Sequence, residues 1–355
     1  MKILFAGHWH WSQNEKGLYD AFVSLGHDVK KFDFLEFFQG KMGYYQRVFP
    51  FPGLAFWKLN RAFLQRVYDT DPDVVIIWNG THVLPRTLRQ IQSWGSVVVL
   101  YSNDDPFGAL AWPHRSWKHY FFWIWYLKCV KDADVTFVNR RVNVKEAVTL
   151  GARNVYLLRS YFIPDLHCPV ELSALDKERF ACDVVFAGHY ENDGRLEYLR
   201  ALVQAGVHVR LFGGGYWTKT TLGGLSSYFG EVLPAHDEDY VKALCGAKIC
   251  LCFLSKMNRD IYTRRCFEIP ACGRLLLSER TDDLQEMFVE GKEAVFFSSK
   301  EELVEKAQWL LRHPKEIDRI AEAGRKRVWA DSHDVVSRAR QALQFIQKDV
   351  KDKRR

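Results

Sequence analysis

The segment NRDIYTRRCFEIPACGRLLLSE (258–279) combines residues that suit an anionic ligand carrying hydroxyl groups. Arg264 and Glu268 are four residues apart and therefore share one face of a helix. Arg265 adds a second positive charge that Glu268 alone does not balance. Guanidinium groups bind diphosphates and a carboxylate accepts hydrogen bonds from hydroxyls, so these residues suit a sugar nucleotide. The alternative is an exposed ion pair, which would contribute only about 0.5 kcal/mol.

The neighbouring segments place this helix inside the fold. It follows the apolar stretch KICLCFLS (248–255) and precedes RLLLSE (274–279), both of which are typical of buried strands. A helix at the carboxyl end of a buried strand lies on the ligand-binding side of a parallel sheet. This position favours a ligand site over a surface ion pair.

Two glycine-containing turns are further candidates for the same site. In AGHYENDGR (187–195), Gly188 and His189 follow a predicted strand, and Arg195 lies in the first turn of the next helix, whose N-terminus suits an anion. In LFGGGYW (211–217), Gly213, Gly214 and Gly215 cost chain entropy, which favours a close approach of the backbone to a ligand. A flexible surface loop is the alternative for the three glycines.

The elements around these residues alternate between strands and helices in two series, which predicts an α/β protein with two parallel sheets. The first series has strands at 2–7, 28–34, 73–80, 96–103, 134–139 and 155–160, and the second at 182–188, 207–215, 248–255, 274–279 and 294–299. Both series open alike, with ILFAGHWH and VVFAGHYE. We therefore expect two Rossmann-like, doubly wound domains facing a central cleft, at 1–165 and 182–330, joined by a linker at 166–181.

Residues 262–328 resemble the C-terminal domain of the CgeB-like (spore-maturation-protein-like) glycosyltransferases. The resemblance extends over most of 182–340 and includes VVFAGHYENDGR and LFGGGYW. These enzymes have the GT-B fold and are related to the family 4 glycosyltransferases. The resemblance implies a nucleotide-sugar donor bound by the second domain. It also implies that the final segment, 331–355, forms a helix packed back on the first domain, followed by a basic tail.

In the wider group a Glu-x7-Glu motif contacts the donor, and its second glutamate binds the ribose in an E…ACG context. Glu268 fits this second position, with Gly273 ending the ACG triplet. Asp260 occupies the first position, where it departs from the usual glutamate.

The first domain would bind the acceptor, which could be a glycan, a lipid-linked molecule, a protein or a small molecule. In YSNDDPFG (101–108), Asp104 and Asp105 end a strand and could act as a general base; the alternative is a helix cap or turn beside Pro106. His8 is another candidate base.

Three further polar residues of the first domain are candidate acceptor contacts. His10 lies in the turn after the first strand, and Asn79 and His82 lie in WNGTH (78–82).

The composition of the chain argues against several other classes of protein. The net charge of +7 over 355 residues is too small for a nucleic-acid-binding protein. Apolar runs stay shorter than the roughly 18 residues that span a bilayer. Eight cysteines without CxxC pairs are typical of a reducing, cytoplasmic protein without a disulfide framework or zinc site. The aromatic segment 112–131 predicts either a packed helix or weak peripheral contact with the inner face of the membrane.

The sequence thus predicts a glycosyltransferase that uses a nucleotide sugar without a bound metal or other cofactor, because arginines stabilise the departing diphosphate. One alternative is a nucleotide-sugar 2-epimerase on the same fold. The other is a non-catalytic sugar-binding or coat-assembly protein.

Overall fold

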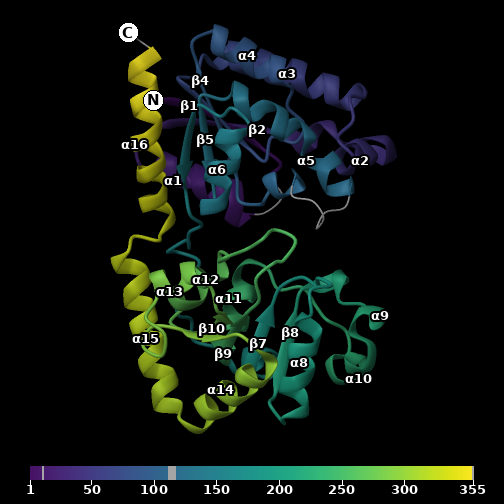
Figure 1. Cartoon of the computed structure of the whole chain (residues 1–355), viewed down its shortest axis with the longest axis vertical. Coiled ribbons are helices and arrows are strands. Elements are labelled where there is room, and N and C mark those ends of the chain that lie inside the picture. Colours follow the sequence, from purple (N-terminus) through teal and green to yellow (C-terminus); the bar gives the residue numbers. More distant parts are fainter. Residues whose placement is uncertain (10–11, 111–116, 354–355) are drawn as a thin grey trace. The chain divides into compact units, whose positions relative to one another are not determined.

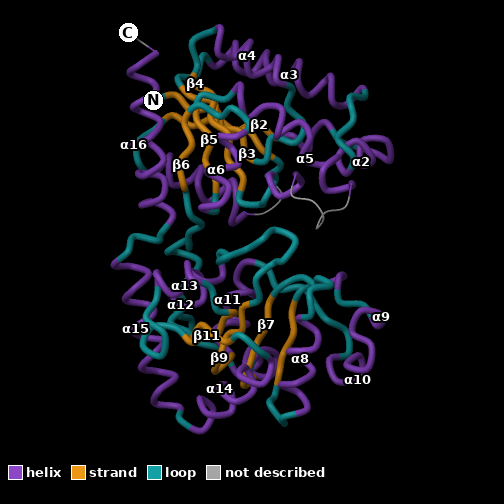
Figure 2. Tube along the Cα trace, in the orientation of Figure 1, coloured by secondary structure: helices purple, strands orange, loops and turns teal. Residues whose placement is uncertain are grey.

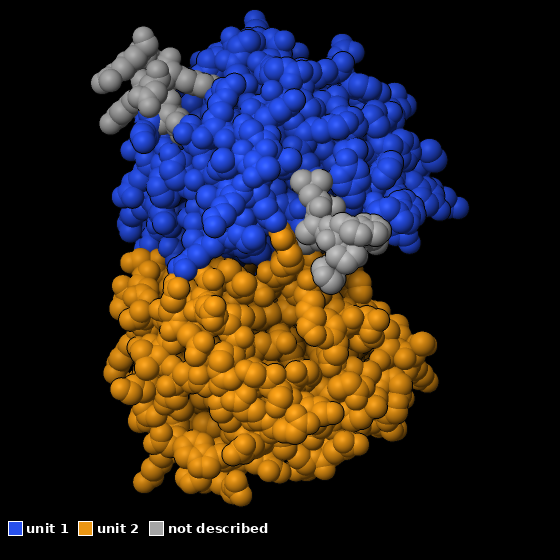
Figure 3. Space-filling model, viewed as in Figure 1, with its two compact units in different colours: residues 1–160, 335–355 blue, residues 161–334 orange. Residues whose placement is uncertain are grey.

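The computed structural model describes residues 1–9, 12–110 and 117–353. The chain forms two compact units, Met1–Ser160 with Val335–Arg355, and Tyr161–Asp334 (Figure 3). Each unit contains one parallel sheet and its covering helices (Figures 1 and 2).

The sheet of the first unit has six parallel strands in the order β2-β1-β3-β4-β5-β6. Its strands are β1 (Lys2–Gly7), β2 (Asp28–Asp33), β3 (Val74–Trp78), β4 (Val97–Ser102), β5 (Val135–Val138) and β6 (Asn154–Leu157). Every residue of β3 and β4 is buried, as expected for central strands covered by helices on both faces. Its helices are α1 (Gly17–Ser24), α2 (Gly40–Val48), α3 (Leu54–Thr70), α4 (Pro85–Ser93), α5 (Trp117–Cys129), α6 (Arg141–Thr149) and α16 (Val335–Lys353).

Helix α16 returns from the end of the chain to the first unit, where it packs against α1 and β4. Phe345 of α16 stacks on Tyr156 of β6, with 4.1 Å between the ring centroids. The apolar face of the last helix therefore completes the core of the unit that begins the chain.

The sheet of the second unit has five parallel strands in the order β11-β10-β9-β7-β8. Its strands are β7 (Cys182–Ala187), β8 (Val209–Phe212), β9 (Ala247–Cys252), β10 (Leu275–Glu279) and β11 (Val295–Phe297). Alternate residues of β7 belong to two different apolar clusters, so both faces of this sheet are buried. The helices are α7 (Ala174–Phe180), α8 (Arg195–Gln204), α9 (Lys219–Leu222), α10 (Ser226–Phe229), α11 (Asp237–Gly246), α12 (Arg265–Ala271), α13 (Asp282–Met287), α14 (Lys300–Arg312) and α15 (Pro314–Ala330).

Two boundaries differ from the sequence-based expectation. Residues 166–181 belong to the second unit, and they include α7, whose last residue Phe180 is fully buried in the core. The prolines of this segment suggested a linker, but its scattered apolar side chains pack against the second core. Strand β8 ends at Phe212, because Gly214–Tyr216 turn into a 3-10 helix.

Each sheet has one point where the chain reverses its direction of strand addition. In the first unit this point lies between β1 and β3, and in the second between β7 and β9. Open α/β sheets bind ligands beside such a switch point, at the carboxyl ends of the strands. We therefore expect a ligand site at the loops that follow these four strands.

Candidate functional site

The switch point of the second sheet brings together three segments that are distant in sequence. Gly188 and His189 follow β7, Phe253 follows β9, and Arg265 begins α12. The Nη2 of Arg265 donates to the carbonyl of Phe253 at 3.3 Å. A methyl group placed on Gly188 would lie 3.4 Å from Nη1 of Arg265. The guanidinium group thus lies over the turn that follows β7.

Arg265 still has an N–H group that can donate a hydrogen bond to a ligand at this position. Its Nε is buried and has no hydrogen-bond partner among the residues that the structure describes. Burial lowers the pKa of Arg265, but Cys252, Tyr240 and Glu268 oppose this effect and leave the pKa above its usual value. Arg265 therefore stays charged and suits an anion at the switch point.

Glu268 is the buried carboxylate of the site, with only 3% of its surface exposed. Its Oε2 accepts a hydrogen bond from the hydroxyl of Tyr240 at 2.8 Å. Burial and the charge of Glu268 raise the pKa of Tyr240, so that hydroxyl stays protonated and donates. The other oxygen, Oε1, has no hydrogen-bond partner within the described part of the chain. A buried carboxylate oxygen without such a partner is costly and suits a hydroxyl of a bound ligand.

His167 faces the same carboxylate oxygen, with its Nε2 3.5 Å from Oε1 of Glu268. The Nδ1 of His167 accepts from the backbone N–H of Ile163 at 2.9 Å, so the proton of the neutral ring is on Nε2. Burial lowers the pKa of His167, while the charge of Glu268 opposes this shift. A neutral His167 therefore presents an N–H toward Glu268.

Arg264 approaches Glu268 from the preceding turn. Its Nε lies 3.7 Å from Oε1 of Glu268, too long for a hydrogen bond. Its guanidinium group lies over the ring of Tyr161, 5.2 Å from the centroid. Arg264 is mostly buried, so this pair is not the exposed ion pair considered as an alternative from the sequence.

The glycines of the two turns have different roles. A methyl group on Gly213 would lie 2.1 Å from the carbonyl oxygen of Gly188, which also accepts from Trp217 Nε1 at 2.7 Å. Gly214 has a φ of +66°, where a side chain is strained. Both are thus required by the packing of the turn itself. A methyl group on Gly215 would meet no described atom within 4 Å, so only Gly215 offers open backbone to a ligand.

His189 contacts Tyr216, which follows the three glycines, and it also lies near the positive charge of Arg265. Its ring meets the edge of Tyr216, with 4.7 Å between centroids. Burial lowers the pKa of His189, and the positive charge of Arg265 lowers it further. His189 is therefore a neutral group next to the arginine of the site.

The guanidinium group of Arg195 is engaged within the protein. It binds Asp193 through two contacts, Nε to Oδ1 at 2.9 Å and Nη2 to Oδ2 at 2.6 Å, and donates from Nη1 to the carbonyl of His189 at 2.5 Å. Its side chain is nearly fully buried. This geometry favours a role in holding the turn 188–194 rather than the direct ligand contact expected from the sequence.

Gly273 and Asp260 also have local structural partners. Gly273, with a φ of +66°, follows the end of α12, and its N–H donates to the carbonyl of Pro270 at 2.8 Å. This geometry is typical of a helix C-terminus. Asp260 closes the loop after β9, because its Oδ2 accepts from the N–H of Ser255 at 3.3 Å and its own N–H donates to the Ser255 carbonyl at 2.9 Å.

Several polar residues near this site were not predicted from the sequence. Tyr240 and His167 contact Glu268 from segments 28 and about 100 residues away in sequence. Ser255 Oγ donates to Glu191 Oε2 at 2.7 Å, which joins the loops after β9 and β7. No motif marks these residues, because only the folding of the sheet brings them together.

In the first unit, the switch point between β1 and β3 brings His8 and His82 together. Nε2 of His8 lies 3.3 Å from Nδ1 of His82. Nε2 of His82 lies 3.2 Å from the carbonyl oxygens of Gln46 and Arg47, so it carries the proton. Nδ1 of His82 is then an acceptor, and Nε2 of His8 donates to it.

The other predicted residues of the first unit differ in their surroundings. His82 is fully buried and holds His8 from within, so its position favours a supporting role over the direct acceptor contact expected from the sequence. Asn79 has a φ of +51°, and its Oδ1 is buried without a hydrogen-bond partner among the described residues. This orphaned amide oxygen suits a ligand at the switch point.

The contacts of Asp105 are those of a helix cap, which was the alternative to a general base in the sequence analysis. It is fully buried, and its Oδ1 accepts from the N–H of Gly108 at 3.0 Å and from Nδ2 of Asn143 at 2.9 Å. Asp104 is half-buried, and its carbonyl accepts from Ser102 Oγ at 3.3 Å. His10 lies outside the described residues.

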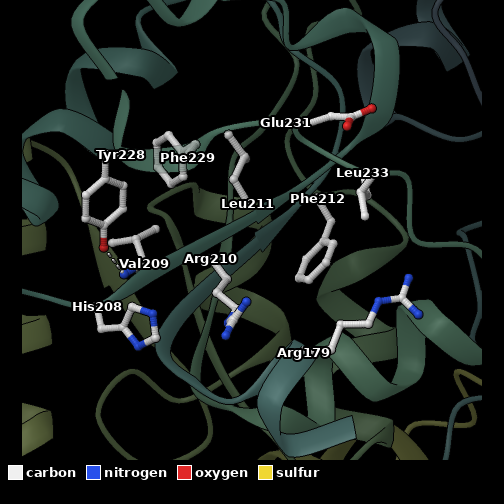
Figure 4. A pocket seen from close by; sticks show the side chains of 10 residues that line it. All are labelled: Arg179, His208, Val209, Arg210, Leu211, Phe212, Tyr228, Phe229, Glu231 and Leu233. Carbon is white, nitrogen blue, oxygen red and sulfur yellow. Dashed lines mark hydrogen bonds between the residues drawn. The ribbon is translucent and has the colours of Figure 1, made fainter. Parts of the chain in front are cut away.

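A cavity of about 330 Å³ lies along the edge strand β8 (Figure 4). Its two arginines are engaged, Arg179 with Asp239 at 2.8 Å and Arg210 with the carbonyls of Ala181 and Glu178. Tyr228 fills part of the wall, and its hydroxyl accepts from the N–H of Val209 at 3.0 Å. None of the predicted site residues lines this cavity, so it is separate from the site at the switch point.

Among the residues that the structure describes, no group of three or more His, Cys, Asp or Glu side chains could hold a metal ion. No helix of the described chain has the length and apolar character needed to cross a bilayer.

Residues 195–344 match the family model described as "Glycosyl transferase-like". This region includes α12 and the candidate site residues Arg264, Arg265 and Glu268. This part of the chain is therefore similar in sequence to glycosyl transferase-like domains. No curated protein is detectably similar to the chain in sequence.

Solved structures show the fold of the whole chain. Sucrose-phosphate synthase from Thermosynechococcus elongatus has a TM-score of 0.69 at 12% identity, over 98% of this chain and 99% of that chain. HepE from Anabaena, in complex with UDP and glucose, has a TM-score of 0.65 at 13% identity, over 98% and 100%. A "putative UDP-N-acetylglucosamine 2-epimerase" from Listeria monocytogenes has a TM-score of 0.58 at 11% identity, over 97% and 94%. The chain thus has two Rossmann-like domains of the GT-B type.

Proposed function

We propose that this chain, with its GT-B fold and glycosyltransferase-like second unit, is a hexosyltransferase that uses a nucleotide-sugar donor. The observation that carries this proposal is the set of contacts around the buried carboxylate of Glu268. One of its oxygens is held by Tyr240, the other has no hydrogen-bond partner among the described residues, and Arg265 begins the same helix. A ribose or sugar hydroxyl would bind the second oxygen.

The donor diphosphate would lie against Arg265 and Arg264, with the open backbone of Gly215 and the turn at Gly188 beside it. Fixed positive charges next to a departing diphosphate stabilise the charge that develops in the transition state. UDP is the favoured nucleotide, because the structurally similar HepE is described in complex with UDP and glucose. Within the glycosyltransferases, the motifs around Glu268 support membership of the CgeB-like group.

The acceptor, a glycan, lipid-linked molecule, protein or small molecule, would bind at the switch point of the first sheet. Here His8 is the favoured general base. Because its Nε2 donates to His82, its Nδ1 is the unprotonated nitrogen, and a fully buried His82 fixes this tautomer. Asn79 would orient the acceptor hydroxyl. Asp104 is the alternative base, whereas the contacts of Asp105 support a capping role.

We also propose that the reaction proceeds without a bound metal, because two arginines already supply positive charge at the donor site. Turnover that is unchanged by EDTA would support this proposal, and loss of turnover restored by Mg²⁺ would overturn it. The eight free cysteines support a reducing, cytoplasmic location.

The experiment that tests the function is titration calorimetry with UDP, UDP-glucose, UDP-N-acetylglucosamine and GDP-mannose, followed by measurement of nucleotide release. We expect one UDP-sugar to bind, and UDP to be released faster when a suitable acceptor is added. Absence of binding by every nucleotide sugar would overturn the proposal. Binding without any turnover would support a non-catalytic sugar-binding protein instead.

A nucleotide-sugar 2-epimerase is the second candidate, favoured by the structural likeness to the Listeria protein described as such. An epimerase would invert the configuration at C2 of the donor sugar in the absence of any acceptor. Proton NMR of UDP-N-acetylglucosamine incubated with the protein distinguishes the two activities. A new C2 epimer would support the epimerase, and an unchanged donor would count against it.

A further inference from the structure

Helix α2 buries a polar side chain and exposes aromatic ones. Gln46 is only 5% exposed, and its Oε1 accepts from the backbone N–H of Ala55 at 3.1 Å. Tyr44 and Tyr45, on the same helix, are 53% and 54% exposed. A helix that only packed on a core would have the opposite pattern. The outward apolar side chains therefore need another explanation.

These side chains belong to a larger exposed region, which we call the α2–α3 surface. It comprises Met42, Tyr44, Tyr45, Val48, Phe49, Phe51, Leu54 and Trp57, all of which are exposed. Such a density of exposed large apolar residues marks an interaction site.

Helix α5 supports this surface from the side. Trp125 donates from Nε1 to the carbonyl of Pro50 at 2.5 Å, and its ring lies 5.6 Å from that of Phe56. Figure 1 shows α2 and α5 close to each other in the first unit. The exposed Trp117 and Phe121 of α5 extend the apolar character of this region.

The same region is positively charged. The sequence contains no Asp or Glu between Glu36 and Asp69, and none between Asp105 and Asp132. Basic side chains lie beside the exposed rings, with Arg86 over Trp57 at 4.4 Å. The exposed basic residues of α2 and α3 are Lys41, Lys58, Arg61 and Arg66.

We propose that the α2–α3 surface docks on an anionic lipid bilayer. Tyr and Trp rings favour the level of the lipid head groups, and lysine and arginine are attracted to anionic lipids. Protein interfaces are instead depleted in lysine, so the exposed Lys41 and Lys58 beside these rings, in a stretch without acidic residues, favour an anionic bilayer over a protein partner. This docking is independent of the donor site, which lies in the second unit.

Flotation of the full chain with vesicles tests the proposal. We expect the protein to float with vesicles of phosphatidylglycerol and phosphatidylcholine, to stay behind with phosphatidylcholine alone, and to be released at high salt. Each basic residue near an anionic surface strengthens binding about fivefold, so K41Q/K58Q should bind roughly 25-fold more weakly. The triple variant Tyr44→Ser/Tyr45→Ser/Leu54→Ser should lose flotation.

The matched control is Tyr68→Ser, since Tyr68 is exposed on the same helix α3 but outside the surface, beside Trp94. This variant should float like the unchanged protein. Equal flotation with both kinds of vesicle, or no weakening in K41Q/K58Q, would overturn the proposal. So would self-association in lipid-free solution that the triple variant abolishes, because the surface would then bind a second copy. The salt dependence and K41Q/K58Q provide the test even if the triple variant misfolds.

Discussion

At the scale of single residues, the proposed donor site depends on how Glu268 is held. Tyr240 donates a hydrogen bond to one carboxylate oxygen, Oε2. Nε2 of His167 and Nε of Arg264 lie 3.5 and 3.7 Å from the other oxygen, Oε1. The carboxylate is thus fixed in position by a buried hydroxyl while one oxygen keeps its capacity to accept. Such pre-organisation lowers the cost of binding a ligand hydroxyl.

We expect Glu268→Gln to weaken binding of UDP roughly 10- to 100-fold, because a hydrogen bond to a charged group contributes about 1.5–3 kcal/mol. Titration calorimetry measures this change. The control is Glu322→Gln, which removes an exposed carboxylate that pairs with Lys326 on α15. Unchanged UDP affinity in Glu268→Gln would contradict the assignment of the ribose contact.

Two buried histidines predict a pH dependence of stability. Burial lowers the pKa of His82 well below its usual range, and the charge of His8 lowers it further; burial also lowers the pKa of His167. The unfolded chain, with histidine pKa values near about 6.5, therefore binds protons more tightly than the native protein. The free energy of unfolding should be constant above about pH 6.5 and fall below it, by up to about 1.4 kcal/mol per pH unit for each histidine.

Urea unfolding at neutral and acidic pH measures this slope. In His82→Asn the slope should be smaller than in the unchanged protein, although its stability at neutral pH also falls because buried hydrogen bonds are lost. The double variant with His167→Gln should reduce the slope further. A slope unaffected by either substitution would show that acid acts on other groups.

At the scale of elements, the turns after β7 and β8 act as one structure. The carbonyl of Gly188 accepts from Trp217 while Gly213 packs against it. Arg195 and Asp193 hold the other side of the first turn at the start of α8. The position of the backbone at the switch point therefore depends on contacts between two loops rather than on either loop alone.

Gly213→Ala and Gly215→Ala form a matched pair that separates packing from ligand approach. The methyl group of Gly213→Ala would lie 2.1 Å from the Gly188 carbonyl oxygen, so we expect a loss of stability of at least about 2 kcal/mol. Gly215→Ala meets no described atom within 4 Å, and should retain stability but bind UDP more weakly. Thermal unfolding and calorimetry measure the two effects. Equal UDP affinity in Gly215→Ala and the unchanged protein would contradict a donor contact at Gly215.

At the scale of the whole molecule, the chain builds its first unit from both of its ends. Ile346 of α16 is fully buried, and Phe345 beside it stacks on Tyr156 of β6. Residues far beyond the second unit in sequence therefore contribute to the core of the first.

We expect Ile346→Ala to lower the stability of the first unit by about 2–4 kcal/mol, as for other large-to-small core substitutions. UDP affinity should be unchanged, because the residues of the proposed donor site all belong to the second unit. Thermal unfolding and calorimetry on the same variant measure both quantities. A large loss of UDP affinity at a temperature where the variant is folded would contradict the expectation that UDP binding by the second unit does not depend on the core of the first.

The amino-acid sequence by itself determined the fold class and the order of the strands along the chain, because buried parallel strands are continuous apolar runs separated by helical periodicity. It also indicated Arg264, Arg265 and Glu268, which lie within one short segment.

Only the tertiary structure decided which side chains surround them. Tyr240 and His167 meet Glu268 across long separations, Arg195 is neutralised by Asp193, and His82 is buried behind His8. Local patterns carry the periodicity of elements, whereas such contacts depend on strand order and on which loops share a switch point.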